Sequence, residues 1–223
     1  MKRVLIIVEG DTEKEFVDEV LSPYLMSRGV YNIQCFKIKK TKGGLIKYQH
    51  LKKDLIKTVY ESNVLVTTMI DFYALPDDFP GYEKAKRIAN KSERLSFLEK
   101  SIVEDLETTQ NTTFANLMPY IQLHEFESLV FVSLDAIKAL YSETEAKFDE
   151  LAEIIKQYPN PEDINDGLQT APSKRLENNQ LIRGYNKVID GNLIIIETGI
   201  DAILEKCPRF RKWVDTIIEK ANL

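Results

Sequence analysis

The stretch LIIVEGDTEKEF, residues 5–16, joins the end of an expected strand to the start of an expected helix. Residues 4–8 form an uninterrupted apolar run, which is typical of a central parallel strand covered on both faces. Apolar residues then recur at helical spacing from position 16 to position 25. Gly10 permits a sharp turn between the two elements. The chain therefore begins as a strand, a turn and a helix.

The alternation of strands and helices continues beyond this stretch. Further strands are predicted at residues 32–40, 64–70 and 114–123, and further helices at residues 45–60 and 92–107. Elements in this order form right-handed crossovers and a parallel sheet. We expect a single α/β domain over residues 1–223. Residues 1–135 are its core, a Rossmann-like parallel sheet of about four strands flanked by helices, and residues 136–223 are a mainly helical extension.

Composition excludes several classes of protein. No apolar run is long enough to span a membrane, and the first residues lack the features of a signal peptide. Cys35 and Cys207 are far apart and match no zinc spacing, so we expect a cytoplasmic protein with reduced thiols. The formal net charge of −5 argues against a general polyanion binder but is compatible with a local basic surface.

Carboxylates stand where three of the expected strands end. Glu9, Asp71 and Glu125 follow the first, third and fourth strands. In an open parallel sheet ligands bind beyond the carboxyl ends of the strands, so we expect these acids to converge on one edge. Clustered carboxylates repel one another, and a hard divalent cation is a suitable partner for them. The sequence thus predicts a site for Mg²⁺ (or Mn²⁺).

Two further glutamates are candidates to complete this site. Thr12 and Glu15 fit a capping box, so we expect a helix to begin near Thr12 with Glu13 in its first turn. Acids at a helix start are also favoured by the helix dipole alone. Glu125 and Glu127 share one face if the chain is extended there and point apart if it is helical, so either can be the ligand.

Basic residues near the expected site are candidate contacts for nucleic acid. Lys40 and Lys42 belong to a lysine-rich stretch and precede two glycines whose amides can approach a phosphate. Lys174 and Arg175 are candidates for stabilising phosphate charge, and Lys174 is taken as a catalytic residue with Glu9 and Asp71. A solvated helix face explains the first pair equally well, and ordinary surface charge at a helix start explains the second.

Six ordered motifs carry a resemblance to a known family. They are VEGDTEKEF (8–16), TTMIDFYALPDDFPGYEKA (67–85), IQLHEFESLVF (121–131), TAPSKRL (170–176), GYNKV (184–188) and CPRFRKWV (207–214). With them the chain resembles a bacterial TOPRIM-like family, related to the metal-dependent domain of topoisomerases and primases and to the old-type (overcoming-lysogenization-defect) nucleases. TOPRIM domains carry a glutamate after the first strand, matched by Glu9, and a D-x-D after a later strand. Asp71 matches its first aspartate, whereas Tyr73 replaces the second.

The resemblance implies a ligand set and an activity. Its metal ligands are Glu9, Glu13 and Asp71, completed by Glu125 and Glu127. The expected activity is Mg²⁺- or Mn²⁺-dependent hydrolysis of phosphodiester bonds in DNA or RNA, in which a second ion can stabilise the leaving oxygen. Gene neighbours of such proteins often include ATPases, so an ATPase is a candidate partner in phage defence.

Two other functions are compatible with the same residues. The first is a TOPRIM-like regulatory subunit that binds metal or nucleic acid without cutting, and Tyr73 favours it. The second is a phosphoacceptor receiver, because acids after the first strand and an aspartate after the third are also its pattern. Receivers are much shorter than this chain, and formation of an aspartyl phosphate with a small phosphodonor tests for one.

Overall fold

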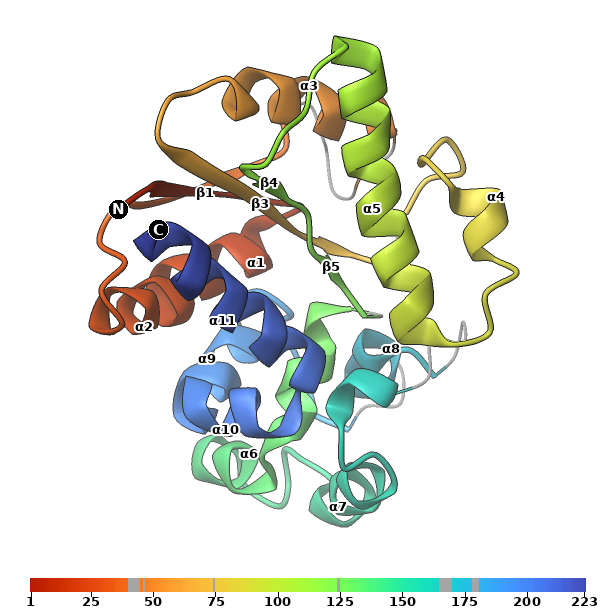
Figure 1. Ribbon diagram of the computed structural model, residues 1–223. Helices are drawn as coiled ribbons and strands as arrows, with labels where there is room; N and C mark the ends of the chain where they lie inside the picture. Colours follow the sequence, from red (N-terminus) through yellow and green to blue (C-terminus); the bar gives the residue numbers. More distant parts are fainter. Residues whose placement is uncertain (40–44, 46, 74, 124, 165–169, 178–180) are drawn as a thin grey trace.

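A parallel β-sheet forms the centre of the computed structural model, which describes residues 1–39, 45, 47–73, 75–123, 125–164, 170–177 and 181–223. The strands are β1 (Arg3–Val8), β2 (Ile33–Lys37), β3 (Val64–Asp71), β4 (Leu117–Met118) and β5 (Ile121–Gln122). Their order is β2-β1-β3-β4, with β5 also paired to β3, and every pairing is parallel (Figure 1). The predicted α/β class with a parallel sheet and C-terminal helices is therefore confirmed.

The predicted fourth strand is divided into β4 and β5 because a proline interrupts it. Pro119 has no N–H to contribute to the ladder. The hydroxyl of Thr68 in β3 substitutes for the missing ladder bonds. It donates to the carbonyl oxygen of Tyr120 over 2.7 Å and accepts from its backbone N–H over 2.9 Å. Both short strands therefore stay aligned on β3.

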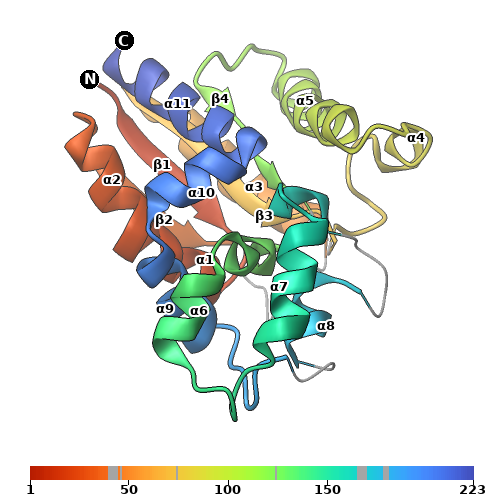
Figure 2. The same ribbon diagram turned by 90° about the horizontal axis from the view of Figure 1, so that it is seen from below.

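Helices cover both faces of the sheet, as the buried central strands require. One face carries α3 (Tyr48–Val59), α4 (Tyr82–Ala85) and α5 (Lys91–Gln110). The other carries α1 (Asp11–Phe16), the π-helical turn η1 (Val17–Leu21), α2 (Ser22–Ser27), the 3₁₀ turn η2 (Phe126–Val132), α9 (Ile189–Thr198), α10 (Ile200–Lys206) and α11 (Pro208–Asn222). The remaining helical segments are α6 (Leu134–Leu140), α7 (Phe148–Gln157), η3 (Pro161–Asp163) and α8 (Pro172–Glu177). Figure 2 shows α11 running along the sheet and α6 and α7 farther from it.

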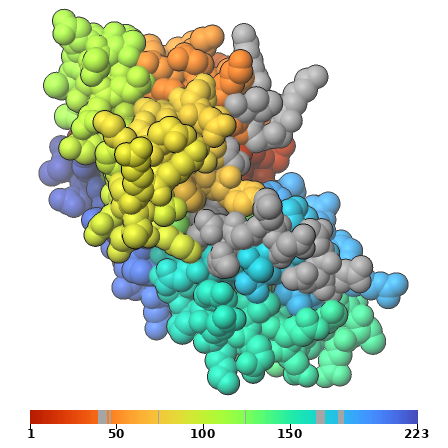
Figure 3. Space-filling model, turned by 90° about the vertical axis from the view of Figure 1, so that its right-hand side faces the viewer, coloured from red at the N-terminus to blue at the C-terminus, as the bar shows by residue number. Residues whose placement is uncertain are grey.

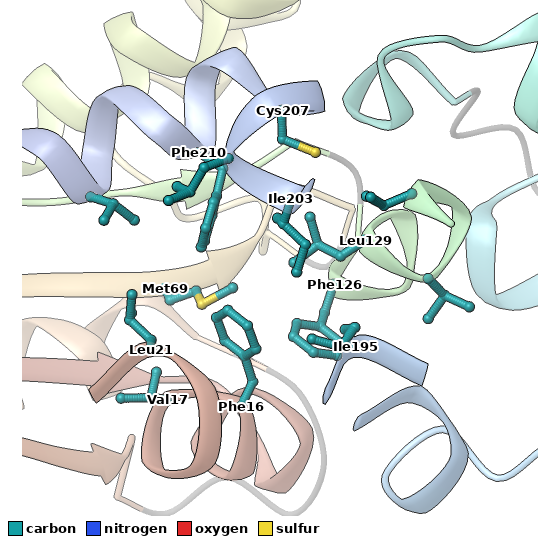
Figure 4. Packing of buried hydrophobic residues seen from close by; sticks show 14 of the residues in the cluster. Phe16, Val17, Leu21, Met69, Phe126, Leu129, Ile195, Ile203, Cys207 and Phe210 are labelled. Atoms are coloured by element: carbon teal, nitrogen blue, oxygen red, sulfur yellow. The ribbon is translucent and has the colours of Figure 1, made fainter. Parts of the chain in front are cut away.

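Aromatic side chains join the C-terminal helices to the sheet. Phe16 of α1 packs edge-on against Phe126, with ring centroids 5.4 Å apart, and lies 5.9 Å from Phe210 of α11 (Figure 4). Nε1 of Trp213 donates to Oγ1 of Thr67 in β3 over 2.8 Å. The last helix therefore belongs to the same core as the first strand.

The two ends of the described chain lie side by side (Figure 1). The backbone N–H of Lys2 donates to the carbonyl oxygen of Ala221 over 2.8 Å. None of the helices in the described ranges is both long and apolar enough to cross a membrane.

Candidate functional site

A pocket of about 270 Å³ lies at the carboxyl ends of β1 and β3. It is lined by Glu9, Gly10, Asp11, Thr12, Glu13, Lys37, Ile38, Asp71, Lys187 and Val188. Three of the predicted metal-binding residues thus share one cavity with Lys187, which we did not identify from the sequence as a site residue.

Glu9 and Asp71 meet across neighbouring strands. Oε2 of Glu9 accepts a hydrogen bond from the backbone N–H of Asp71 over 3.4 Å, and Oε1 accepts from the backbone N–H of Leu45 over 3.1 Å. A carboxylate oxygen has two lone pairs, so each oxygen keeps acceptor capacity for a cation. Two of the predicted strand-end acids therefore lie together.

Gly10 positions the side chain of Glu13. The predicted capping box of Thr12 and Glu15 is wrong. Helix α1 begins at Asp11, with Gly10 as its N-cap. Oε2 of Glu13 accepts from the backbone N–H of Gly10 over 2.9 Å. A Cβ atom at position 10 would lie 3.0 Å from the same oxygen. The missing side chain of Gly10 thus leaves room for the Glu13 carboxylate.

Burial and mutual repulsion favour the protonated forms of these acids. Burial, followed by the charge of Glu13, raises the pKa of Glu9 to about 7. Burial, followed by the charges of Glu13 and Glu9, raises the pKa of Asp71 well above its usual value. A bound divalent cation would displace these protons and remove the repulsion.

Lys187 brings a positive charge to the pocket. It lies just before α9, and its Nζ is 3.0 Å from Oε1 of Glu127. Burial lowers the pKa of Lys187, but the charges of Glu127 and Asp71 outweigh this effect and the pKa rises overall. The side chain therefore stays charged at neutral pH. The only signal in the sequence that could have identified Lys187 was its place in the GYNKV motif.

Asn192 links the segment of Lys187 to the helix of Glu13. Its side chain is buried, and Nδ2 donates to the carbonyl oxygen of Thr12 over 3.2 Å and to that of Val188 over 2.9 Å. Both of these residues line the pocket. Asn192 therefore joins two walls of the cavity.

Glu125 and Glu127, the predicted completing ligands, are buried but are not among the described residues that line the pocket. Oε2 of Glu125 accepts from the backbone N–H of Ser173 and Oε1 accepts from its Oγ, each over 2.9 Å. Glu127 is 0% exposed and contacts Lys187. Burial raises the pKa of Glu127 to about 7, although Lys187 opposes the rise. The turn η2 begins between the two glutamates, so they point to different partners.

The predicted phosphate contacts on α8 also lie outside the described lining of this pocket. Nζ of Lys174 is 3.5 Å from Oε2 of Glu177 on the same helix. Nε of Arg175 donates to the carbonyl oxygen of Thr170 over 2.7 Å. Ser173, and not Lys174, faces the buried Glu125, so the lysine stays at the surface. Figure 3 shows the face of the molecule on which the chain around α4 lies above α7 and α8.

The lysine-rich stretch that contains Lys40 and Lys42 is described only in part. Lys40 and Lys42 lie outside the described residues. In the described part of the lysine-rich stretch, Lys52 pairs with Asp105 over 2.8 Å and so joins α3 to α5. Lys37 lines the pocket, and its Nζ donates to Asp11 over 2.5 Å.

The carboxylates do not form a ready-made metal cage. Among the described residues, no three His, Cys, Asp or Glu side chains are arranged as a preformed metal site. Mg²⁺ requires less, because it keeps several waters and is usually bound through one or two carboxylates together with substrate phosphates. Glu9 and Asp71, with Glu13 beside them, fit a hydrated ion of this kind.

A comparison with protein families matches the chain over residues 8–218. The chain belongs to the family DUF4276. DUF4276 is described as a domain of unknown function, so membership assigns no activity. The DUF4276 match includes Glu9, Glu13, Asp71, Glu127 and Lys187. No curated protein and no solved structure matches the chain.

Proposed function

We propose that this protein is a Mg²⁺- or Mn²⁺-dependent phosphodiester hydrolase that acts on DNA or RNA. The observation that carries the proposal is the meeting of Glu9, Glu13 and Asp71 with Lys187 in one pocket. Clustered carboxylates are suited to a hard cation, and a lysine beside them is suited to an anionic substrate. The resemblance to TOPRIM nucleases supports the same activity, and from it alone comes the proposal of an ATPase partner in phage defence.

Each side chain has a role in the proposed reaction. Glu9 and Asp71 hold the metal, and Glu13 adds negative charge beside them. When bound, the metal polarises the phosphate and activates a water molecule. Lys187 stabilises the charge that develops on the phosphate oxygens in the transition state.

One observation favours a second function, a regulatory subunit that binds metal or nucleic acid and cuts neither DNA nor RNA. Tyr73 stands where the TOPRIM pattern has its second aspartate, and its side chain is exposed and is not among the described pocket residues. A site with fewer carboxylates can hold a hydrated ion and still lack the means to complete the reaction.

A nuclease assay separates these functions. Single- and double-stranded DNA and RNA are incubated with the purified protein and Mg²⁺ or Mn²⁺, with and without EDTA. We expect metal-dependent cleavage of at least one substrate, reduced about 100-fold or more by Glu9→Gln and by Asp71→Asn. Asp135→Asn, an exposed acid outside the pocket lining, is the control and should leave cleavage unchanged.

Binding measurements complete the assay. Titration with Mn²⁺ reports whether a metal binds and whether Glu9→Gln removes it. Binding without cleavage of any substrate would favour the regulatory subunit. If the protein shows no binding and no cleavage, both functions are rejected.

A further inference from the structure

Glu127 occupies an unusual position for an acid. Its side chain is 0% exposed, at the start of the turn η2. The residue before it, Phe126, donates its backbone N–H to Oδ1 of Asp71 over 3.1 Å. The backbone that carries Glu127 is therefore fixed to one of the proposed metal-binding acids, although Glu127 itself is not among the described pocket residues.

Within the described chain, Glu127 forms a salt bridge with Lys187. Nζ of Lys187 is 3.0 Å from Oε1 of Glu127, a carboxylate that is itself inaccessible to solvent. The side chain of Lys187 is 38% exposed and lines the pocket. The lysine thus contacts a buried acid on one side and the cavity on the other.

This arrangement restricts a side chain that is otherwise flexible. Lysine has a four-carbon stem and loses rotamer entropy when it is fixed. A buried carboxylate is costly without a partner, so Glu127 and Lys187 each favour the position in which they meet. If Glu127 turned toward the cavity to bind metal, this contact would be lost.

We infer that Glu127 is a positioning residue. It holds the ammonium group of Lys187 in the pocket, ready to contact a substrate phosphate, and it does not bind the metal. The role of Lys187 toward phosphate rests on the proposed function. The fixed placement of Lys187 by Glu127 does not depend on it. The two parts therefore have separate tests.

The first test measures how firmly Lys187 is held and does not depend on nuclease activity. The protein is labelled with an amine-reactive acylating reagent, and the labelling rate of each lysine is followed by mass spectrometry. Lys174 is a matched internal control, because its side chain is 36% exposed and is also paired with a glutamate. In Glu127→Gln we expect Lys187 to be labelled at least about threefold faster, since its fixed partner is gone, and Lys174 to be labelled at the same rate. An unchanged rate at Lys187 overturns the inference even if the protein has no nuclease activity.

The second test separates a positioning residue from a metal ligand. Mn²⁺ affinity, kcat and KM are measured for wild type, Glu127→Gln, Lys187→Met and the double variant. We expect Glu127→Gln to keep its Mn²⁺ affinity within about twofold and to lose about 10- to 100-fold in kcat with little change in KM. The double variant should be no slower than Lys187→Met, because the two residues act as one unit.

Each test has a control and outcomes that would overturn the inference. Glu125→Gln changes a buried glutamate two positions away, whose contact is with Ser173, and should leave the labelling of Lys187 unchanged. A tenfold or larger loss of Mn²⁺ affinity in Glu127→Gln would make Glu127 a ligand and overturn the inference. Additive losses in the double variant would also overturn it. A wild-type protein that binds no Mn²⁺ and cuts nothing rejects the proposed function, while the labelling result still decides the placement of Lys187.

Discussion

The carboxylate of Glu9 accepts a hydrogen bond of 3.4 Å from the backbone N–H of Asp71 across neighbouring strands. The bond joins the end of β3 to the residue that follows β1, so the distance between the two acids is set by the sheet. Both side chains reach the pocket from rigid elements and not from a long loop. The sheet thus places both acids in the lining of one pocket.

In the absence of metal, we expect stability to fall as the pH rises from about 4.5 to about 7. The unfolded chain releases the proton of Glu9 near pH 4.5, whereas the folded protein retains it up to about pH 7. The unfolded state then binds fewer protons across this interval, so the free energy of unfolding decreases with pH. The full shift corresponds to roughly 3 kcal/mol. Urea unfolding at a series of pH values measures it.

Two comparisons check the origin of this pH dependence. Glu9→Gln carries no titrating group at this position, so its stability should vary less with pH than that of the wild type. Mg²⁺ or Mn²⁺ should stabilise the wild type at pH 8 and much less at pH 5, where protons compete for the same oxygens. Equal pH profiles for the wild type and the variant would contradict the assignment.

Gly10→Ala should weaken metal binding by about tenfold and leave the fold intact. The backbone angles of Gly10 are extended and suit alanine, but the new Cβ would crowd Oε2 of Glu13 at 3.0 Å. Mn²⁺ titration measures the effect, with circular dichroism as the check on folding. In a Glu13→Gln background the same substitution should add little, because both changes act on one carboxylate. Independent, additive losses would show that Gly10 acts by another route.

Asn192→Ala should lower turnover by about tenfold, because it releases the segment of Lys187 from the helix of Glu13. Asn222→Ala is the matched control. Nδ2 of Asn222 bonds a carbonyl four residues earlier, at Ile218, as Nδ2 of Asn192 does at Val188, but it is exposed. Kinetics and hydrogen exchange of the first turn of α1 measure the effect. Equal exchange rates in Asn192→Ala and wild type would show that the link is not needed.

Thr67→Val should lower the free energy of unfolding by about 2 kcal/mol. Valine keeps the shape of the side chain but removes the acceptor of the buried indole N–H of Trp213 and the donor to the carbonyl oxygen of Met118. The control is Thr216→Val, whose exposed hydroxyl bonds only the carbonyl oxygen of Lys212 within α11, and it should change stability by about 0.5 kcal/mol or less. Urea unfolding gives both values. A loss for Thr67→Val as small as that of the control would show that Trp213 finds another acceptor.

The parallel strands and the meeting of two acids were predictable because both follow from local pattern and sheet geometry. Apolar runs marked β1 and β3, and adjacent parallel strands necessarily bring the residues after them to one edge. The division of the fourth strand was not predicted. It depends on the absent N–H of Pro119 together with a hydroxyl from Thr68, a residue distant in the sequence.

The cation of the pocket was not predictable from local pattern. Lys187 reaches the strand ends only because α9, α10 and α11 pack back onto the sheet, and that packing depends on contacts such as the one between Trp213 and Thr67. Lys174 was predicted as the catalytic cation, and Lys187 was not named as a site residue. Nothing in the spacing of the two lysines distinguishes the one that lines the pocket from the one that pairs on the surface of α8.

The pocket takes its acids from the first 71 residues of the chain, whereas Lys187 comes from the C-terminal helical part. During synthesis on the ribosome, the acids emerge long before the cation that completes the arrangement. A nascent chain, or a product of premature termination before residue 187, therefore lacks a complete site. The complete pocket can therefore form only after residue 187 has been translated, late in the synthesis of the domain.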